Sequence, residues 1–173
     1  MNEWATHLEM ISMDKWLRGN GNIEEMEWIE ADAIKYSNEI AMVLKAKSKG
    51  PNRQRMLLAK VFIEIVKKEM LHWLVSGGVF GSTSRGEAKK KSDVDVLLFL
   101  QPLTSEEKRI QNALDIVQSR RFLEFNIANN SYRIAELASV FTEKTGIEVS
   151  PFEYYIQDQE EWKGRFKPIM ILE

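Results

Sequence analysis

The sequence predicts an α/β protein of the α+β kind, in which a small mixed β-sheet is flanked by helices and follows an N-terminal all-helical extension. Apolar residues recur at helical spacing through roughly the first 70 residues. Short β-rich apolar runs then appear near residues 77–81 and 93–100, and another returns at 147–156. We therefore expect a helical extension over residues 1–70 and a sheet-bearing domain over residues 71–173.

The extension is predicted to contain about three helices. The first, over residues 4–17, is amphipathic and ends before a Gly-Asn-Gly-Asn break. The second runs from about residue 22 to residue 48, and its first turn is rich in glutamate, which suits the helix dipole. The third runs from about residue 52 to residue 73, and we expect its C-terminal part to pack beside the sheet.

The second domain alternates strands and helices. A glycine-rich strand at 77–81 runs into a turn, and the apolar run at 93–100 follows as a longer strand. The remaining predicted elements are helices at 104–119 and 131–144, a strand at 147–156, and an edge strand or packed tail at 167–172.

Composition limits the function. The chain of 173 residues has a net charge of −2 and a hydrophobic content of 44%, which is enough for a core but gives no global attraction to nucleic acid. It contains no cysteine, which excludes disulfides and thiolate chemistry and agrees with a cytoplasmic location. The N-terminus does not resemble a signal peptide, and no segment has the roughly 20 apolar residues of a membrane helix, so we expect no membrane association.

The most informative stretch is Phe80-Gly81-Ser82-Thr83-Ser84-Arg85-Gly86-Glu87, which is followed by Ser92-Asp93-Val94-Asp95-Val96. Glycines let backbone N–H groups approach phosphates closely. Because side chains alternate along a strand, Asp93 and Asp95 point the same way and lie about 7 Å apart along the chain. This spacing suits one or two Mg²⁺ ions held between carboxylates and a polyphosphate.

Other side chains of this stretch are candidates for contacts to a nucleotide. Ser82 and Ser84 can donate hydroxyl hydrogen bonds to phosphate oxygens, and Arg85 offers a planar guanidinium for the same purpose. Three lysines at 89–91 add positive charge just before the aspartates, and Lys91 is included among the nucleotide-binding candidates together with Gly81.

The pattern of Gly81-Ser82, ten residues, and then Asp93-Val94-Asp95 resembles the signature of the DNA polymerase beta-type nucleotidyltransferase superfamily. Within it, the local sequence is most similar to the small minimal nucleotidyltransferases of bacteria and archaea. The resemblance covers roughly residues 70–173, implies the nucleotidyltransferase fold there, and leaves the helical extension unexplained.

The resemblance also implies a third carboxylate on a later strand, for which the sequence offers two candidates. Glu153 lies in a β-rich segment, and its spacing from the acidic stretch downstream favours it. Glu148 lies between Ile147 and Val149. The two differ in parity along a strand, so only one is expected to face the metals.

The function implied by the resemblance is transfer of a nucleoside monophosphate, most simply AMP from ATP, to an unidentified hydroxyl acceptor. Asp93, Asp95 and Glu153 would be the catalytic and metal-binding residues, with Glu148 as the alternative third acid, and the cofactor would be Mg²⁺ or Mn²⁺. Pyrophosphate would leave, stabilised by the Gly81–Ser82 backbone and by Arg85.

A second class of function stays open, namely a nucleotide-binding or interaction module without catalysis. Minimal members of the family often act as the antitoxin of a small helical protein, so a protein partner is one expectation and a homodimer another. A row of basic residues between Lys45 and Lys60 leaves room for nucleic acid, although nothing else in the sequence indicates it.

Overall fold

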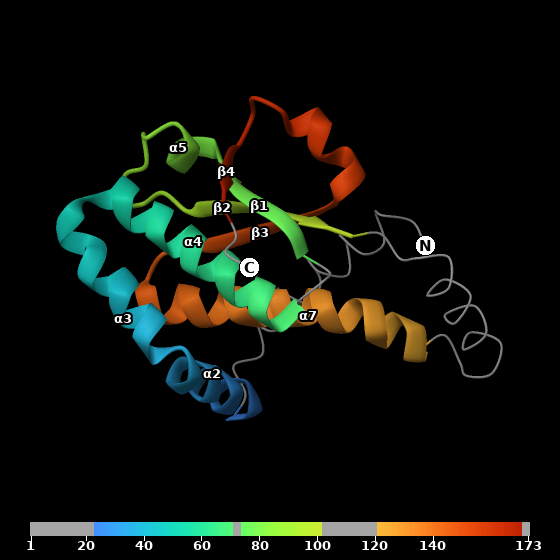
Figure 1. Ribbon diagram of the computed structural model, residues 1–173. Helices are drawn as coiled ribbons and strands as arrows, with labels where there is room; N and C mark the ends of the chain where they lie inside the picture. The colour runs from blue at the N-terminus through green and yellow to red at the C-terminus, as the bar shows by residue number, and fades with distance from the viewer. Residues whose placement is uncertain (1–22, 71–73, 102–120, 171–173) are drawn as a thin grey trace. The chain divides into compact units, whose positions relative to one another are not determined.

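The computed structural model describes residues 23–70, 74–101 and 121–170 (Figure 1). The chain divides into two compact units. One comprises Met1–Trp28 with Leu103–Glu136, and the other comprises Ile29–Pro102 with Leu137–Glu173. The sheet lies in the second unit. The helices predicted at 4–17 and 104–119 lie outside the described residues.

Helices precede the sheet, as the sequence predicts. They are α2 (Ile23–Lys35), α3 (Ser37–Lys45), the 3₁₀ helix η1 (Ala46–Lys49) and α4 (Pro51–Met70). The prediction of a single helix over residues 22–48 is wrong in one respect, because the helix is interrupted at Tyr36, between α2 and α3. The buried Tyr36 ring lies against α4, where its hydroxyl donates a hydrogen bond to Glu69, so tertiary packing fixes the break.

The sheet is mixed, as predicted, and has four strands among the described residues. They are β1 (Leu74–Phe80), β2 (Val94–Leu100), β3 (Val149–Tyr155) and β4 (Lys167–Ile169), in the order β3-β2-β1-β4. β1 is antiparallel to β2 and β4, whereas β2 and β3 are parallel. The connecting helices are the short α5 (Gly81–Ser84), α7 (Arg121–Thr145) and the 3₁₀ helix η3 (Ile156–Trp162).

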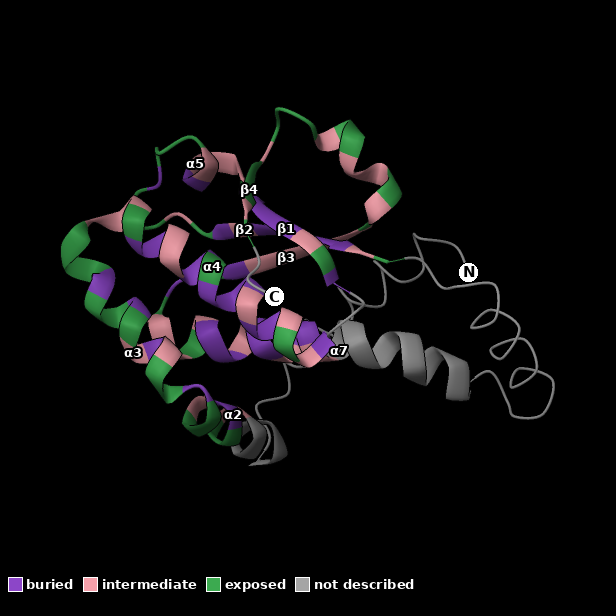
Figure 2. Cartoon of the chain, viewed as in Figure 1, coloured by how far each residue is buried: buried purple, intermediate pink, exposed green. Residues whose placement is uncertain are grey.

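One face of the sheet is covered by α4 and by the C-terminal part of α7 (Figure 1). Gly77 of β1 makes this close packing achievable, because a Cβ atom there would lie 3.1 Å from the Ile63 side chain. Phe62 of α4 and Phe141 of α7 meet edge to face with ring centroids 6.3 Å apart. The two phenylalanines are fully buried and anchor the apolar core between helices and sheet. Figure 2 shows buried residues along the described parts of α4 and α7.

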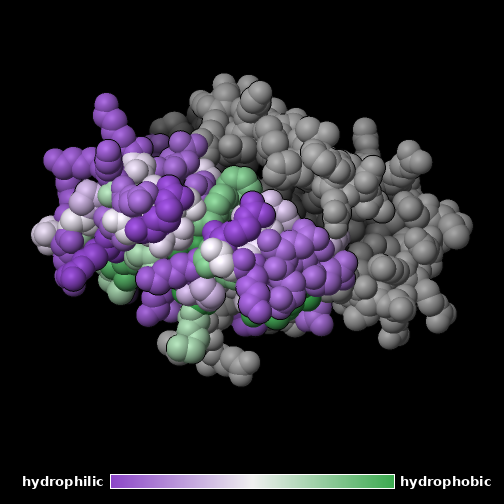
Figure 3. All heavy atoms as spheres, turned by 90° about the horizontal axis from the view of Figure 1, so that it is seen from above, coloured by the Kyte–Doolittle hydropathy of each residue, from purple (hydrophilic) through white to green (hydrophobic). Residues whose placement is uncertain are grey.

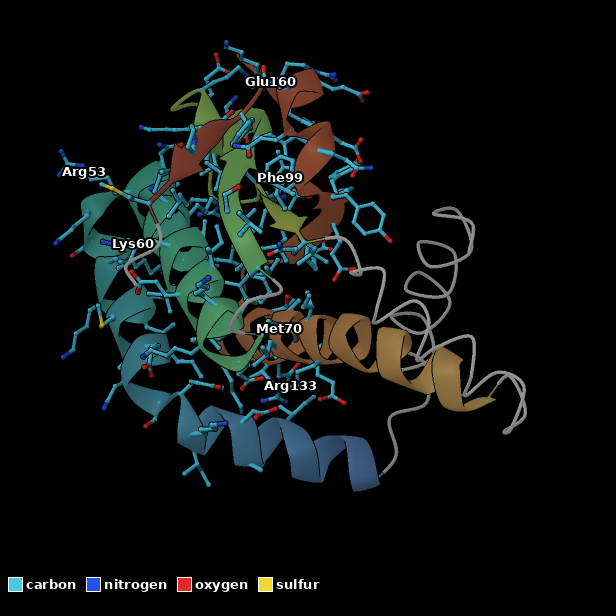
Figure 4. All side chains as sticks on the ribbon, turned by 45° about the vertical axis from the view of Figure 1, so that its right-hand side comes forward. Arg53, Lys60, Met70, Phe99, Arg133 and Glu160 are labelled. Carbon is cyan, nitrogen blue, oxygen red and sulfur yellow. The ribbon has the colours of Figure 1, made fainter. Side chains whose placement is uncertain are left out.

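The opposite face carries an aromatic cluster under η3 and the segment that follows it. The rings of this cluster contact one another with centroids 5.0–6.5 Å apart; they belong to Phe80, Phe99, Phe152, Tyr154, Trp162 and Phe166. Gly78 is needed here because a Cβ would lie 2.6 Å from the Phe166 ring. Figure 4 labels Phe99 on the sheet within this layer. The two faces of the sheet are therefore distinct, which decides where each strand residue points.

Candidate functional site

The Gly-Ser turn forms where β1 ends. β1 pairs with β2 so that Phe80 lies opposite Asp95, and the chain then turns into α5 at Gly81. Gly81 has φ of +70°, a conformation that side chains other than glycine adopt at a cost. A Cβ atom at Gly81 would also lie 2.8 Å from Oδ2 of Asp95. Glycine therefore serves two purposes here: it allows the turn, and it lets the Asp95 carboxylate rest directly against the backbone.

Hydrogen bonds inside the turn hold its shape. The Ser84 hydroxyl donates to the Gly81 carbonyl at 2.7 Å, and the Glu87 amide donates to the Ser82 carbonyl at 2.9 Å. Thr83 is 2% exposed, and its buried hydroxyl finds no hydrogen-bond partner among the described residues. Because the Ser84 proton is used within the turn, the contact to phosphate expected of this hydroxyl would require the bond to Gly81 to break.

The two cations expected to contact a nucleotide are both at the surface. Arg85 follows α5 directly, and its Nε lies 2.9 Å from the Glu87 carboxylate, with both side chains more than half exposed. Lys91 is exposed in the loop before β2. Neither side chain is fixed by packing, so both can reorient toward a ligand.

A buried arginine fastens the loop that leads to the aspartates. Arg55 of α4 is 3% exposed and donates hydrogen bonds to the carbonyls of Ser92 at 2.7 Å and Lys90 at 2.8 Å. Nearby, the side-chain oxygen of Asn52 accepts a bond from the Ala88 amide at 3.2 Å. Burial lowers the pKa of the Arg55 guanidinium, while the negative charge of Asp93 acts in the opposite direction. The loop before Asp93 is thus seated on the first turns of α4.

The two aspartates open the second strand. Asp93 is exposed and immediately precedes β2, and Asp95 is half-buried within it. The pKa of Asp95 is raised from its ordinary value of 3.8 to about 6, first by burial and then by the negative charges of Asp93 and Glu148. The negative charges of Asp93 and Glu148 are therefore both close enough to act on the Asp95 carboxyl.

Register explains why Glu148 joins the pair and Glu153 does not. β2 and β3 are parallel, with Val94 beside Val149 and the Val94 amide bonded to the Glu148 carbonyl at 2.8 Å, so Glu148 flanks Asp93. Glu153 is paired with Leu98, three positions beyond Asp95 along β2 and on the helix-covered face of the sheet. The structure therefore brings Glu148, and not Glu153, next to the aspartates.

The sequence held a signal for this placement. Ile147-Glu148-Val149 has the same apolar–acidic–apolar order as Val94-Asp95-Val96, although the register pairs Asp95 with Ser150 and places Glu148 one step before the Val94–Val149 pair. The role of Arg55 carried no comparable signal. It belongs to the basic row between residues 45 and 60, and only the fold shows that it points inward to the loop.

The acidic cluster has the donor chemistry of a divalent cation site. Carboxylate oxygens are the ligands that Mg²⁺ prefers, and a cation would offset the burial and the neighbouring negative charges that raise the pKa of Asp95. Within the described ranges, however, no three acidic or imidazole side chains are gathered closely enough to form a metal site as they stand. The residues therefore fit such an ion by charge and ligand type, and the Asp93 and Glu148 carboxylates are both exposed.

The comparisons with known proteins give one match. A family model described as a nucleotidyltransferase domain matches residues 59–172, which include the Gly-Ser turn, both aspartates and Glu148. Neither the curated proteins nor the solved structures give a match. In the part of the chain that the structure describes, no helix is long and apolar enough to cross a bilayer.

Proposed function

Because this chain belongs to the nucleotidyltransferase domain family, we propose that it transfers a nucleoside monophosphate, most simply AMP from ATP, to a hydroxyl acceptor. One observation carries the proposal. Asp93, Asp95 and Glu148 lie at one end of neighbouring strands, beside a glycine turn whose backbone rests against the Asp95 carboxylate and can approach phosphates.

In this proposal the three carboxylates hold Mg²⁺ or Mn²⁺. Glu148 is the third carboxylate, instead of Glu153, which the spacing from the downstream acidic stretch had favoured. When bound, divalent cations neutralise phosphate charge and lower the pKa of the acceptor hydroxyl. The Gly81–Ser82 backbone and the Ser82 hydroxyl bind the phosphates, and Arg85 and Lys91 close over them from the surface.

The reaction is an exchange of one phosphorus–oxygen bond for another. The acceptor oxygen bonds to the α-phosphorus, the bond from that phosphorus to the bridging oxygen breaks, and pyrophosphate leaves with the electron pair. The exposed Glu148 carboxylate can take up the acceptor proton. The protein's contribution is mainly to position the reactants and balance their charge, and the Arg55 contacts to the loop before Asp93 support that positioning.

The experiment that tests the proposal is incubation of the purified protein with Mg²⁺, α-phosphate-labelled ATP and a lysate of its host, beside Asp95→Asn. Label on a protein, RNA or small-molecule fraction that appears only with the unmodified chain would support transfer and give the acceptor class. Absence of label with Mg²⁺-dependent ATP binding intact would favour a binding module or an antitoxin-type partner instead.

Two further variants test the third carboxylate. We expect Glu148→Gln to lower transfer at least 100-fold, because it removes a metal-binding charge, a loss of about 3 kcal/mol of transition-state stabilisation. Glu153→Gln should stay within about threefold once activity is normalised to folded protein. Loss of transfer in Glu153→Gln alone would contradict the placement of Glu148 at the metals.

A further inference from the structure

Six exposed cations lie on two segments that meet ahead of Asp93. They come from two segments far apart in sequence, η1 with the start of α4 and the loop before β2; they are Lys47, Lys49, Arg53, Lys89, Lys90 and Lys91. We call these six residues the basic rim. Hydrogen bonds from Arg55 to the Lys90 carbonyl and from Ala88 to Asn52 fasten the two segments together. The two segments of the rim are therefore adjacent, and the second leads directly into Asp93.

The two segments carry no acidic residue of their own, and Glu87 and Asp93 flank the second of them. No acidic residue occurs between Lys45 and Lys60 or among residues 88–92. Within the described residues, none of the six cations is in an ion pair. Because the whole chain has a net charge of −2, this concentration is a local asymmetry. Arg53 projects outward from the start of α4 (Figure 4), and hydrophilic side chains gather over α5 and the loop after it (Figure 3).

We infer that the basic rim binds a single-stranded polynucleotide, whose terminal hydroxyl is the acceptor of the transfer proposed above. The inference rests on that proposed function and names its acceptor class. Lysines meet phosphates as point charges without reading bases, which suits a strand of varied sequence. None of the large exposed apolar side chains in the described residues belongs to either segment, whereas protein interfaces bury an apolar centre. A strand lying along the rim would bring its end to Asp93 and Asp95.

The salt dependence of binding gives this inference a magnitude. Each phosphate neutralised on a single strand contributes about −0.7 to the slope of log affinity against log salt. Six contacts give a slope of about −4, or a loss of roughly 300-fold between 50 and 200 mM salt. Removing three of them should reduce the slope to about −2.

The test uses the full chain and fluorescence anisotropy with labelled 12-nucleotide RNA and DNA of one mixed sequence, over that salt range. The rim variant carries alanine at Lys47, Lys49 and Arg53, which have no assigned role toward the nucleotide. The matched control carries alanine at three other exposed cations, Lys68, Lys163 and Lys167. Binding of Mg²⁺–ATP is measured on the same preparations.

We expect the rim variant to bind strands at least tenfold more weakly at 100 mM salt, with the shallower slope, while the control stays within about twofold. Tighter binding of either RNA or DNA would then identify the acceptor strand. Equal binding by the rim variant, or no binding by the unmodified chain, would overturn the inference. So would an acidic peptide of equal charge that bound as tightly, because the partner would then be a protein.

The two proposals can fail separately. Intact Mg²⁺–ATP binding without strand binding removes the acceptor class and leaves nucleotidyl transfer in place. The opposite result is that the unmodified chain binds the strand, the rim variant does not, and no preparation binds Mg²⁺–ATP. That result supports polynucleotide binding by the basic rim and contradicts the proposed function.

Discussion

Replacing Asp95 by asparagine should stabilise the protein near neutral pH in the absence of metal. The pKa of Asp95 is raised from 3.8 to about 6 by burial and by the charges of Asp93 and Glu148, so the folded state resists ionisation of this carboxyl. A carboxyl group whose pKa is higher in the folded than in the unfolded state lowers the free energy of unfolding at any pH where the group ionises in the unfolded state. The destabilisation is absent below about pH 4, grows as pH rises through 6, and is complete above that.

The magnitude follows from the shift. A rise from 3.8 to about 6 corresponds to about 3 kcal/mol at roughly 1.4 kcal/mol per pH unit. Because the carboxyl is only half-buried, screening by solvent reduces the expected effect to about 1–2 kcal/mol. Asparagine keeps the shape of the side chain against Gly81 and removes the charge. Asp95→Asn should therefore be about 1–2 kcal/mol more stable at pH 7.5 and no more stable at pH 4.

The assay is urea unfolding with EDTA at pH 4, 5, 6 and 7.5, followed by circular dichroism, with Glu143→Gln as a variant that removes an exposed carboxylate of α7. Saturating Mg²⁺ should then stabilise the unmodified protein and leave Asp95→Asn unchanged. The reasoning fails if Asp95→Asn is less stable at pH 7.5, or if its gain is the same at pH 4, because neither result can come from ionisation of this group.

Two other substitutions test the supports of the site. Gly81→Ala should cost about 1–3 kcal/mol of stability and abolish transfer, because the added Cβ would lie 2.8 Å from the Asp95 carboxylate in a positive-φ conformation. Thermal unfolding measures the stability, and the labelling assay measures the transfer. Full transfer activity in this variant would contradict the close contact. Arg55→Met should raise the Mg²⁺ concentration needed for half-maximal transfer at least fivefold, because the loop before Asp93 loses two hydrogen bonds. The control is Gln54→Leu, which removes a buried hydrogen bond to the Val43 carbonyl of α3 and should lower stability without changing the Mg²⁺ dependence of transfer. If Arg55→Met and Gln54→Leu showed the same Mg²⁺ dependence, the role of Arg55 would be purely structural.

Much of the fold could be predicted from the sequence because its strands and helices have strong local patterns. The apolar run at 93–100 became β2 at Val94–Leu100, and the helix expected from residue 52 to 73 became α4 at Pro51–Met70, packed on the sheet. The break at Tyr36 could not be predicted, because it depends on packing against α4 rather than on a glycine or proline. The division of the chain at residue 70 stays a prediction.

The site was predictable only where its residues are close in sequence. Gly81 and Asp95 are 14 positions apart: Gly81 directly follows β1, and Asp95 lies in the antiparallel neighbour β2, reached through α5 and one loop. The third acid depends on the register between β2 and β3, which sequence spacing alone does not define. A shift of one residue in that register would reverse which of Glu148 and Glu153 faces the aspartates.

The parallel pairing of β2 and β3 also sets an order of events during synthesis. The ribosome makes Asp93 and Asp95 more than 50 residues before it makes Glu148, and β3 can pair with β2 only after α7 between them has been made. Until then the nascent chain carries the Gly-Ser turn and two carboxylates without the third. With the role proposed above for Glu148, nucleotidyl transfer should therefore begin only after β3 has been made and has paired with β2, which is a slow, non-local step of folding.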